Sequence, residues 1–138
     1  MANKPMRLVF GETLCELGEE YPELVVLDAD VSGSTQTKLF GSKYKDRFFN
    51  FGIAEANMVS AAAGMATCGL IPVVSTFAFL IALRAGEQVR SLIAYDQLNV
   101  KLAGGYAGLS DFADGASHQA VMDLAVMSAL KFIFLIIF

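Results

Sequence analysis

The feature that most constrains the fold is an alternation of short apolar runs with longer segments of helical spacing. Leu24–Leu27 is a continuous apolar run that ends at Asp28, as expected of a strand buried on both faces. Later segments of similar length are also predicted to be strands: Phe48–Phe51, Ile71–Thr76, Asn99–Ala103 and Ile133–Ile137. Such strands favour a parallel sheet with both faces covered.

The segments between the apolar runs predict helices. They show helical spacing or are dominated by small residues: Pro5–Glu20, Ala54–Gly69, Phe79–Ile93 and His118–Leu130. Ser32–Thr35 is predicted to be a loop. The alternation predicts an α/β fold, with an open, mostly parallel sheet, helices on both faces and right-handed crossovers. Residues 1–138 contain no visible linker or repeat, so we expect one domain.

Composition excludes several classes of protein. The chain is 55% hydrophobic and 17% charged, against about 25% charged in an average soluble protein, which favours buried strands or a large partner interface. A net charge of -4 argues against nucleic-acid binding. The apolar run Phe132–Phe138 is too short to span a membrane, which needs about 20 residues. Cys15 and Cys68 form no zinc or disulfide pattern and fit a cytoplasmic protein.

The sheet predicts where a ligand binds. In open α/β sheets, ligands bind beyond the carboxyl ends of the strands. This rule selects four segments: Asp28–Ser34, Gly52–Asn57, Thr76–Phe79 and Gly104–His118. The glycine pair Gly104–Gly105 is predicted to break the preceding strand, and Gly104–Gly108, which lacks a phosphate-loop spacing, to form a flexible loop on the substrate side.

Individual residues in these segments allow both a structural and a functional interpretation. Glu55 is either a first-turn carboxylate placed by the helix dipole or a buried carboxylate that acts on a heterocyclic nitrogen. His118, the sole histidine, could exchange protons or donate to a substrate oxygen. Phe77 and Phe79 are either core residues or a stacking surface for a flat ring. Asp28 and Asp30 could bind a metal or could be turn residues after a strand.

Several motifs together resemble the pyrimidine-binding domain of transketolases. The resemblance covers Pro5–Ile137 and rests on these segments in order: Arg47–Asn57, Ala62–Ala66, Pro72–Phe77, Glu87–Arg90 and Asp114–Gln119. It implies thiamine diphosphate, Mg²⁺ and transfer of a two-carbon ketol unit between sugar phosphates, as in the pentose phosphate pathway. The expected fold is the thiamine diphosphate-binding fold.

The resemblance also assigns roles to residues. Glu55 is similar to the carboxylate that hydrogen-bonds the aminopyrimidine ring nitrogen, Phe77 to the residue that stacks on that ring, and Asp30 to the residue near the thiazolium. Leu80 stands at a cofactor-contacting position where many transketolases have an aromatic residue, as does Leu83. The cofactor-binding candidates are therefore Asp30, Glu55, Phe77 and Leu80, and the catalytic candidates Glu55 and His118.

Substrate contacts are implied for the segment that carries the histidine. His118 resembles the residue that contacts substrate hydroxyls. Asp114 resembles a neighbouring residue that contacts the donor sugar. Ser32 is a further substrate-binding candidate. Ala116 replaces the usual proline, and the histidine often found near Tyr106 is missing, so the sugar specificity is left open.

The family's magnesium and diphosphate motif, GDG followed by an asparagine, is absent from the sequence. No metal ligands are therefore assigned here, and a diphosphate-binding subunit is expected as partner, in a homo- or hetero-oligomer that is at least a dimer. The small-residue segment Ala54–Gly69 is the candidate interface. The family's third domain is not recognised, so residues 1–138 are interpreted as a truncated pyrimidine-binding domain that is inactive alone.

Three other interpretations stay open. A 1-deoxyxylulose-5-phosphate synthase and the β subunit of a 2-oxo acid dehydrogenase use a similarly placed glutamate, whereas Ser75–Phe77 and Ser117–Gln119 favour transketolase. A degenerate, noncatalytic fragment that serves as a binding module is the third.

Overall fold

The computed structural model describes residues 4–130 and 134–137. Within these residues the chain forms one five-stranded sheet, in the order β2-β1-β3-β4-β5, in which every pairing is parallel. The strands are β1 (Leu24–Asp28), β2 (Phe48–Asn50), β3 (Ile71–Phe77), β4 (Lys101–Gly105) and β5 (Phe134–Ile137). The predicted parallel α/β sheet is confirmed; Ile133, the first residue of the predicted last strand, lies outside the described residues.

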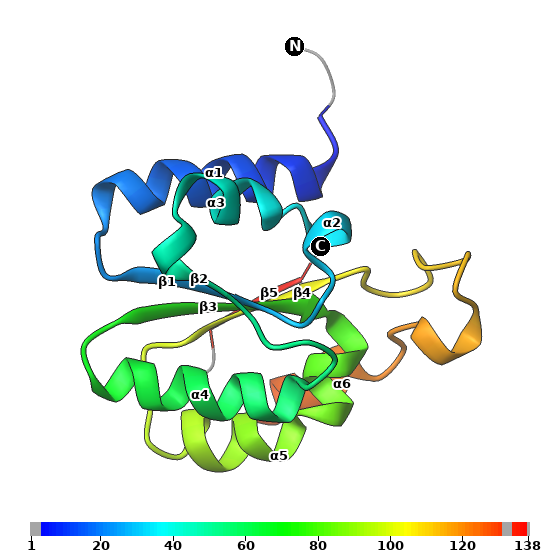
Figure 1. Ribbon diagram of the computed structural model, residues 1–138. Coiled ribbons are helices and arrows are strands. Elements are labelled where there is room, and N and C mark those ends of the chain that lie inside the picture. The colour runs from blue at the N-terminus through cyan, green and yellow to red at the C-terminus, as the bar shows by residue number, and fades with distance from the viewer. Residues whose placement is uncertain (1–3, 131–133, 138) are drawn as a thin grey trace.

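Helices cover both faces of the sheet (Figure 1). One face carries α1 (Met6–Glu20), α2 (Ser32–Thr35) and α3 (Lys38–Lys43), and a short turn, η1 (Lys45–Arg47), leads from α3 into β2. The other face carries α4 (Glu55–Thr67), the segments η2 (Leu80–Arg84), α5 (Gly86–Gln88) and η3 (Val89–Ala94), and α6 (Asp123–Ser128). The last turn, η4 (Ala116–His118), lies in the long connection after β4.

The alternation of side chains along β1 divides the core into two layers. Val25 and Leu27 pack into the cluster beneath α4 and η2, whereas Leu24 and Val26 pack against α1 and α3. All five residues of β1 are buried, because the strand is central and helices lie on both sides. This two-sided burial fixes the sheet and places the ends of its strands at a common edge.

Ser32–Thr35 was predicted to be a loop, and this prediction is wrong. The carbonyl of Val31 accepts hydrogen bonds from the N–H groups of Ser34 and Thr35, which closes one helical turn. The Thr35 hydroxyl also donates to the buried Asp28 carboxylate, so the turn is anchored to the end of β1. The helix α3 was not foreseen either, since Lys38–Lys43 has too few apolar residues for a recognisable period.

The predicted helix His118–Leu130 begins too early. In the structure, Ala116–His118 is a separate turn, and Ala120 pairs with Gly108 in an isolated antiparallel bridge. The Ala120 N–H donates to the Gly108 carbonyl at 2.8 Å, which holds the chain extended until α6 begins at Asp123. This contact joins residues twelve positions apart and leaves no local pattern.

The predicted break at Gly104–Gly105 is also wrong, because both glycines belong to β4. A Cβ atom at Gly104 would lie 2.9 Å from the Ala78 Cα and 3.1 Å from its Cβ. Glycine is therefore required at Gly104 by the close approach of the chain that leaves β3, and not by a turn.

The segment predicted as the helix Phe79–Ile93 is helical but irregular. The Ala85 N–H donates to the Leu80 carbonyl and the Tyr95 N–H to the Arg90 carbonyl, five residues back in each case. Wide turns of this kind interrupt ordinary helices and are frequent at functional sites. Within residues 4–130 and 134–137, no helix has the length and apolar character needed to cross a membrane.

Candidate functional site at the carboxyl edge of the sheet

The carboxyl ends of the parallel strands bring the predicted site segments to one edge. β1 ends at Asp28, which is in register with Asn50 of β2 and Ser75 of β3, and Phe77 of β3 is in register with Gly105 of β4. The connections that leave these residues carry Asp30, Glu55, Leu80 and His118. The structure therefore places the sequence candidates at the edge that the sheet topology selects.

Glu55 begins α4 and is 1% exposed. Its Oε2 atom accepts a hydrogen bond from the Arg84 Nη1 atom at 2.9 Å, an ion pair in which the Arg84 side chain is 49% exposed. Its Oε1 atom has no hydrogen-bond partner within the described residues, and we call it the open oxygen of Glu55. Buried polar atoms in proteins are nearly always hydrogen-bonded, so the open oxygen is suited to a donor from another molecule.

The hydroxyls of Ser75 and Thr76, at the end of β3, are also buried and without a hydrogen-bond partner in the part of the chain described. Asp111, in the connection after β4, is 4% exposed and has one oxygen in the same condition. Asp123, the first residue of α6, has a fifth buried oxygen of this kind, so the unsatisfied atoms lie at the start of α4, at the end of β3 and in the chain after β4. This distribution supports an edge that is completed by a ligand or a second chain.

Asp28 ends β1 and is fully buried. Its carboxylate accepts hydrogen bonds from the Val31 N–H at 2.7 Å, the Thr37 hydroxyl at 2.7 Å and the Thr35 hydroxyl at 3.3 Å. Burial raises the pKa of Asp28, while these hydrogen bonds oppose the shift. The contacts match the turn interpretation of Asp28: it fixes the chain that leads into α2.

Asp30 is exposed and adopts a left-handed backbone conformation, with φ at +65°. Its N–H donates to the Asn50 Oδ1 atom at 3.1 Å, and the Asn50 Nδ2 atom donates to its carboxylate at 3.2 Å. The same Asn50 oxygen accepts from the Gly52 N–H at 2.9 Å. Asn50 therefore joins the chain after β1 to the chain that leads into Glu55.

An aromatic group lies beyond β3 and β4. The centroid of the Phe77 ring lies 4.9 Å from that of Tyr106 and 6.2 Å from that of His118. The centroid of the Phe79 ring lies 5.4 Å from that of His118. The Tyr106 hydroxyl accepts a hydrogen bond from Arg7 at 2.7 Å, and His118 Nδ1 lies 3.0 Å from the Ser117 hydroxyl. The structure thus brings Phe77, Phe79 and the partly exposed His118 together.

Other sequence candidates are less tightly placed. Asp114 is exposed, and no hydrogen bond or ion pair among the described residues joins it to His118. Ser32 is partly exposed in the first turn of α2. Leu80 is 7% exposed and packs inward, whereas Leu83 is 52% exposed.

Sequence reasoning missed Arg84 and Tyr106. Arg84 interrupts the apolar run Leu80–Leu83, and a lone cation in such a run signals a buried anionic partner. Its contact with Glu55 spans 29 positions, so the partner could not be named from spacing.

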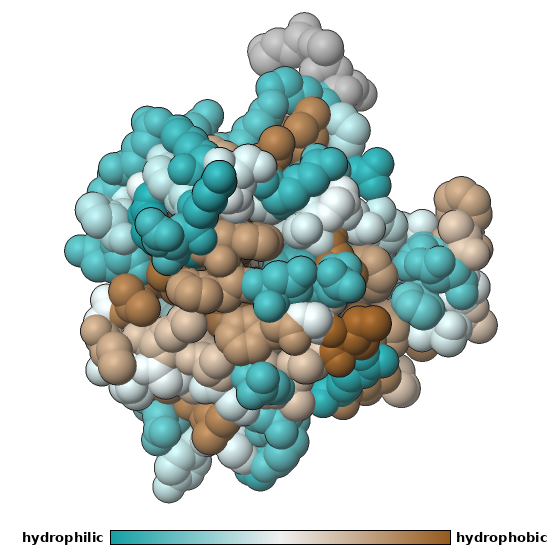
Figure 2. All heavy atoms as spheres, in the orientation of Figure 1, coloured by the Kyte–Doolittle hydropathy of each residue, from teal (hydrophilic) through white to brown (hydrophobic). Residues whose placement is uncertain are grey.

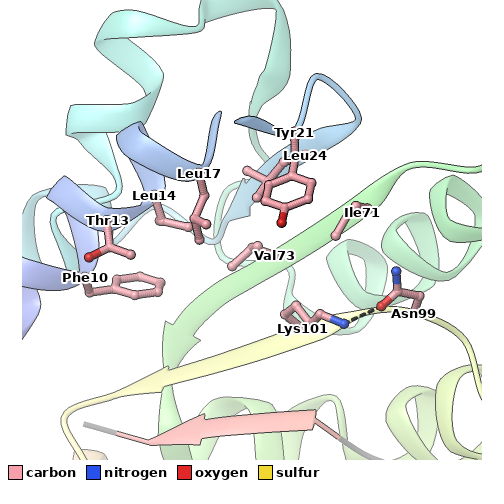
Figure 3. Close-up of a pocket in the computed structure, with 10 residues that line it drawn as sticks. All are labelled: Phe10, Thr13, Leu14, Leu17, Tyr21, Leu24, Ile71, Val73, Asn99 and Lys101. Carbon is pink, nitrogen blue, oxygen red and sulfur yellow. Dashed lines mark hydrogen bonds between the residues drawn. The ribbon is translucent and has the colours of Figure 1, made fainter. Parts of the chain in front are cut away.

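No metal cluster marks another site in the described ranges, and an apolar cavity lies away from the carboxyl edge. No group of three or more His, Cys, Asp or Glu side chains is arranged there to hold a metal ion. An apolar cavity of about 460 Å³ lies at the opposite, amino-terminal ends of β3 and β4, below α1 (Figure 3). Leu14, Leu17 and Val73 line it, and Lys101 contacts Asn99 at its margin. Because its walls are almost wholly apolar, this cavity offers no acid–base chemistry.

The fold and the edge define an open α/β domain with a buried carboxylate, Glu55, at the carboxyl edge of its parallel sheet. The sequence matches the family "Transketolase, pyrimidine binding domain" over residues 2–133. The chain belongs to this family.

Two curated relatives show how the family branches. The chain is 52% identical over 127 residues to a putative transketolase C-terminal section from Methanocaldococcus jannaschii, a match that covers 92% of this chain and 40% of that protein. It is 38% identical over 120 residues to a 1-deoxy-D-xylulose-5-phosphate synthase from Dictyoglomus thermophilum, with 86% of this chain and 19% of that protein covered. The chain thus spans less than half the length of these relatives.

A solved structure described as a split gene transketolase, inactive beta4 tetramer, has a similar fold. The TM-score is 0.77 and the sequence identity 51%, over 90% of this chain and 39% of that one. The domain fold and the family are therefore established together.

Proposed function

We propose that this chain supplies the pyrimidine-binding half of a thiamine diphosphate site in a transketolase. The observation that carries the proposal is Glu55: it is 1% exposed, its Oε2 atom is held by Arg84, and its open oxygen has no hydrogen-bond partner among the described residues. A buried carboxylate of this kind is suited to hydrogen-bond a heterocycle and tune its basicity.

The residues present fit the pyrimidine end of the cofactor. Glu55 would hold the ring nitrogen, Phe77 would offer an apolar face to the ring, Leu80 would contribute packing, and Asp30 would lie towards the thiazolium. When bound, thiamine diphosphate supplies the carbon nucleophile and electron sink for ketol transfer. The protein's part is to position the ring, hold a proton at Glu55 and exclude water.

The substrate side of the proposed site is the segment after β4. His118, held by its hydrogen bond with Ser117 and by the Phe77 and Phe79 rings, would donate to a substrate hydroxyl. Asp114 and Ser32 would contact the donor sugar from more exposed positions. Ketose and aldose phosphates, as in a cytoplasmic pentose phosphate pathway, are the proposed substrates.

The other half of the site would come from a partner. We place Mg²⁺ and the diphosphate in a diphosphate-binding subunit, with the cofactor between the two chains of an assembly that is at least a dimer. The exposed side of α4 is the proposed interface: on the face drawn in Figure 2, hydrophobic residues gather in a band over α4, and Ile53 before it is 75% exposed.

The test is reconstitution of ketol transfer. The chain is mixed with a matching diphosphate-binding subunit, thiamine diphosphate and Mg²⁺, and transfer from xylulose 5-phosphate to ribose 5-phosphate is measured. We expect activity only in the mixture and a loss of about 10²- to 10⁴-fold in Glu55→Gln. Glu87→Gln, at an exposed carboxylate paired with Arg90, is the matched control and should stay active. Full activity of Glu55→Gln would refute the proposal.

A second function is favoured by the relative from Dictyoglomus thermophilum. A 1-deoxyxylulose-5-phosphate synthase would condense pyruvate with glyceraldehyde 3-phosphate, so the same mixture is assayed with this substrate pair. Turnover of pyruvate without ketol transfer would move the chain to this branch of the family. A stable complex without either activity would instead support a noncatalytic binding module.

A further inference from the structure

Arg84 makes the contact that distinguishes Glu55 from an ordinary buried carboxylate. The Nη1 atom donates to the Oε2 atom at 2.9 Å, while the open oxygen Oε1 is left to other donors. The hydrogen bond holds one oxygen of the carboxylate and so restricts rotation of the carboxylate plane. The direction of the open oxygen is therefore set by Arg84 as well as by the backbone of α4.

The irregular helix after β3 is what places Arg84 at this position. Arg84 is the last residue of η2, and the Ala85 N–H bonds to the Leu80 carbonyl five residues back. A wide turn accommodates one residue more than a regular turn and so rotates the side chains that precede it relative to those that follow. Leu80, at the start of η2, is buried, and Arg84, at its end, reaches α4.

Charge gives the contact a second role. Glu55 is buried, whereas the Arg84 side chain is 49% exposed and remains partly hydrated. A buried carboxylate needs a compensating cation, and Arg84 is the one that pairs with it among the described residues. The planar guanidinium of Arg84 presents its N–H donors in a fixed geometry, so one of them can hold the Oε2 atom of Glu55 while the rest of the group stays in water.

We propose that Arg84 is a positioning residue that aims the open oxygen of Glu55 at the cofactor's ring nitrogen. This inference rests on the proposed function, because the role of Arg84 is exercised through Glu55. Arg84 itself touches neither the cofactor nor the substrate in this proposal. A purely structural Arg84 would contribute to the stability of the chain and leave activation of the bound cofactor unchanged.

The experiment separates these roles by reading cofactor activation without substrate. The reconstituted mixture is saturated with thiamine diphosphate and Mg²⁺, and exchange of the thiazolium carbon's proton with deuterium is followed by nuclear magnetic resonance. Arg84→Met should slow this exchange by about 10- to 100-fold, the range expected for loss of a hydrogen bond to a charged group. Arg84→Lys should recover part of the rate, and Arg90→Met, which breaks an exposed pair with Glu87, should leave it unchanged.

The outcomes distinguish the inference from the function on which it rests. Slow exchange in both Glu55→Gln and Arg84→Met supports both. Slow exchange in Glu55→Gln with wild-type exchange in Arg84→Met overturns the inference alone, and wild-type exchange in both overturns the proposed function. If Arg84→Met does not fold, Arg84→Gln, which keeps a donor without the charge, replaces it; wild-type exchange in Arg84→Gln would show that the cation is not needed.

Discussion

At the scale of single residues, a buried carboxylate is tolerated only where hydrogen bonds or a cation compensate it. Asp28 and Glu55, two of the buried carboxylates among the described residues, are compensated in different ways. Asp28 is compensated by donors from its own loop, and Glu55 by a cation from another helix. The first arrangement uses both carboxylate oxygens, whereas the second keeps the open oxygen available. Asp28 is therefore a structural residue, and Glu55 is the one suited to chemistry.

The raised pKa of Asp28 predicts a pH-dependent stability. The folded state binds the proton more tightly than the unfolded state, so the contribution of Asp28 is full below the unfolded pKa, about 3.9. It declines as the pH rises through the higher folded pKa. Asp28→Asn keeps an acceptor for Val31 and should remove this decline. Urea unfolding between about pH 4 and pH 7 gives the free energy of unfolding of both proteins. The prediction would be contradicted if this free energy changed with pH equally in the unaltered chain and in Asp28→Asn.

Arg47 offers a test of a residue that ties two elements together. Its guanidinium donates to the carbonyls of Gly18 at 2.8 Å and Tyr21 at 3.1 Å, at the end of α1, and lies 4.0 Å from the centre of the Tyr44 ring. Arg47→Met removes these bonds and should lower the free energy of unfolding by about 1–3 kcal/mol. Arg47→Lys should recover only part of the lost free energy of unfolding, because an ammonium group cannot reproduce the planar arrangement of guanidinium N–H donors. Denaturant titration measures these differences, and an unchanged unfolding midpoint in Arg47→Met would contradict the prediction.

Several residue roles could be anticipated from the sequence, and others could not. The position of Glu55 after a strand and at the start of a helix was readable, but its burial was not, because burial depends on packing across the sheet. The contacts of Arg84 and Tyr106 join residues far apart in the chain. Such pairs leave no local spacing, so the partner of Arg84 could not be identified even though a lone cation after an apolar run indicates that one exists.

At the scale of elements, the long amphipathic or apolar segments were predictable because their burial repeats along the sequence. The predictions placed α1, α4 and the described strands within a few residues. The short elements α2 and α3 were missed, since a single helical turn is fixed by hydrogen bonds to Val31 and Asp28 and not by a repeat. β4 was predicted to end too early because Gly104 was interpreted as a turn residue. The structure shows instead that glycine is needed there because the Ala78 backbone approaches closely.

Gly104 and Gly64 form a matched pair for testing that cause. A Cβ atom at Gly104 would meet the Ala78 backbone at 2.9 Å, whereas one at Gly64, on the exposed side of α4, would meet nothing within 4 Å. Gly104→Ala should destabilise the chain by about 1–3 kcal/mol through overpacking. Gly64→Ala should stabilise it by about 0.5–1 kcal/mol, because alanine favours the helix. Thermal or urea unfolding gives both values, and equal effects at the two sites would rule out the proposed close contact.

At the scale of the whole molecule, the candidate site is assembled from segments at the carboxyl ends of four strands. The sheet holds Asp30, Glu55, Phe77 and His118 at this edge, and the buried oxygens of Glu55, Ser75 and Thr76 have no hydrogen-bond partner in the described residues. A domain that spans 40% of a curated relative's length is consistent with a site completed elsewhere. The fold could be derived from the sequence, and the missing diphosphate motif led to the prediction of a diphosphate-binding partner, which stays a proposal.

The connection from β4 to α6 should make the isolated chain self-associate. Four of its large hydrophobic residues are exposed: Leu109 at 66%, Phe112 at 84%, Val121 at 73% and Met122 at 51%. Apolar surface of this extent is normally covered by another surface, so molecules of the chain should pair through it when no partner is present. We expect light scattering and sedimentation to show association that grows with concentration and weakens in Phe112→Ser.

The control is Tyr95→Ser, because Tyr95 is 83% exposed after η3 and outside this connection. If association is driven by the connection after β4, Tyr95→Ser should associate like the unaltered chain. Equal weakening by the two substitutions would mean that exposed apolar area in general, and not this connection, drives association. A monomer at all concentrations would mean that the connection folds over its own apolar side chains in solution.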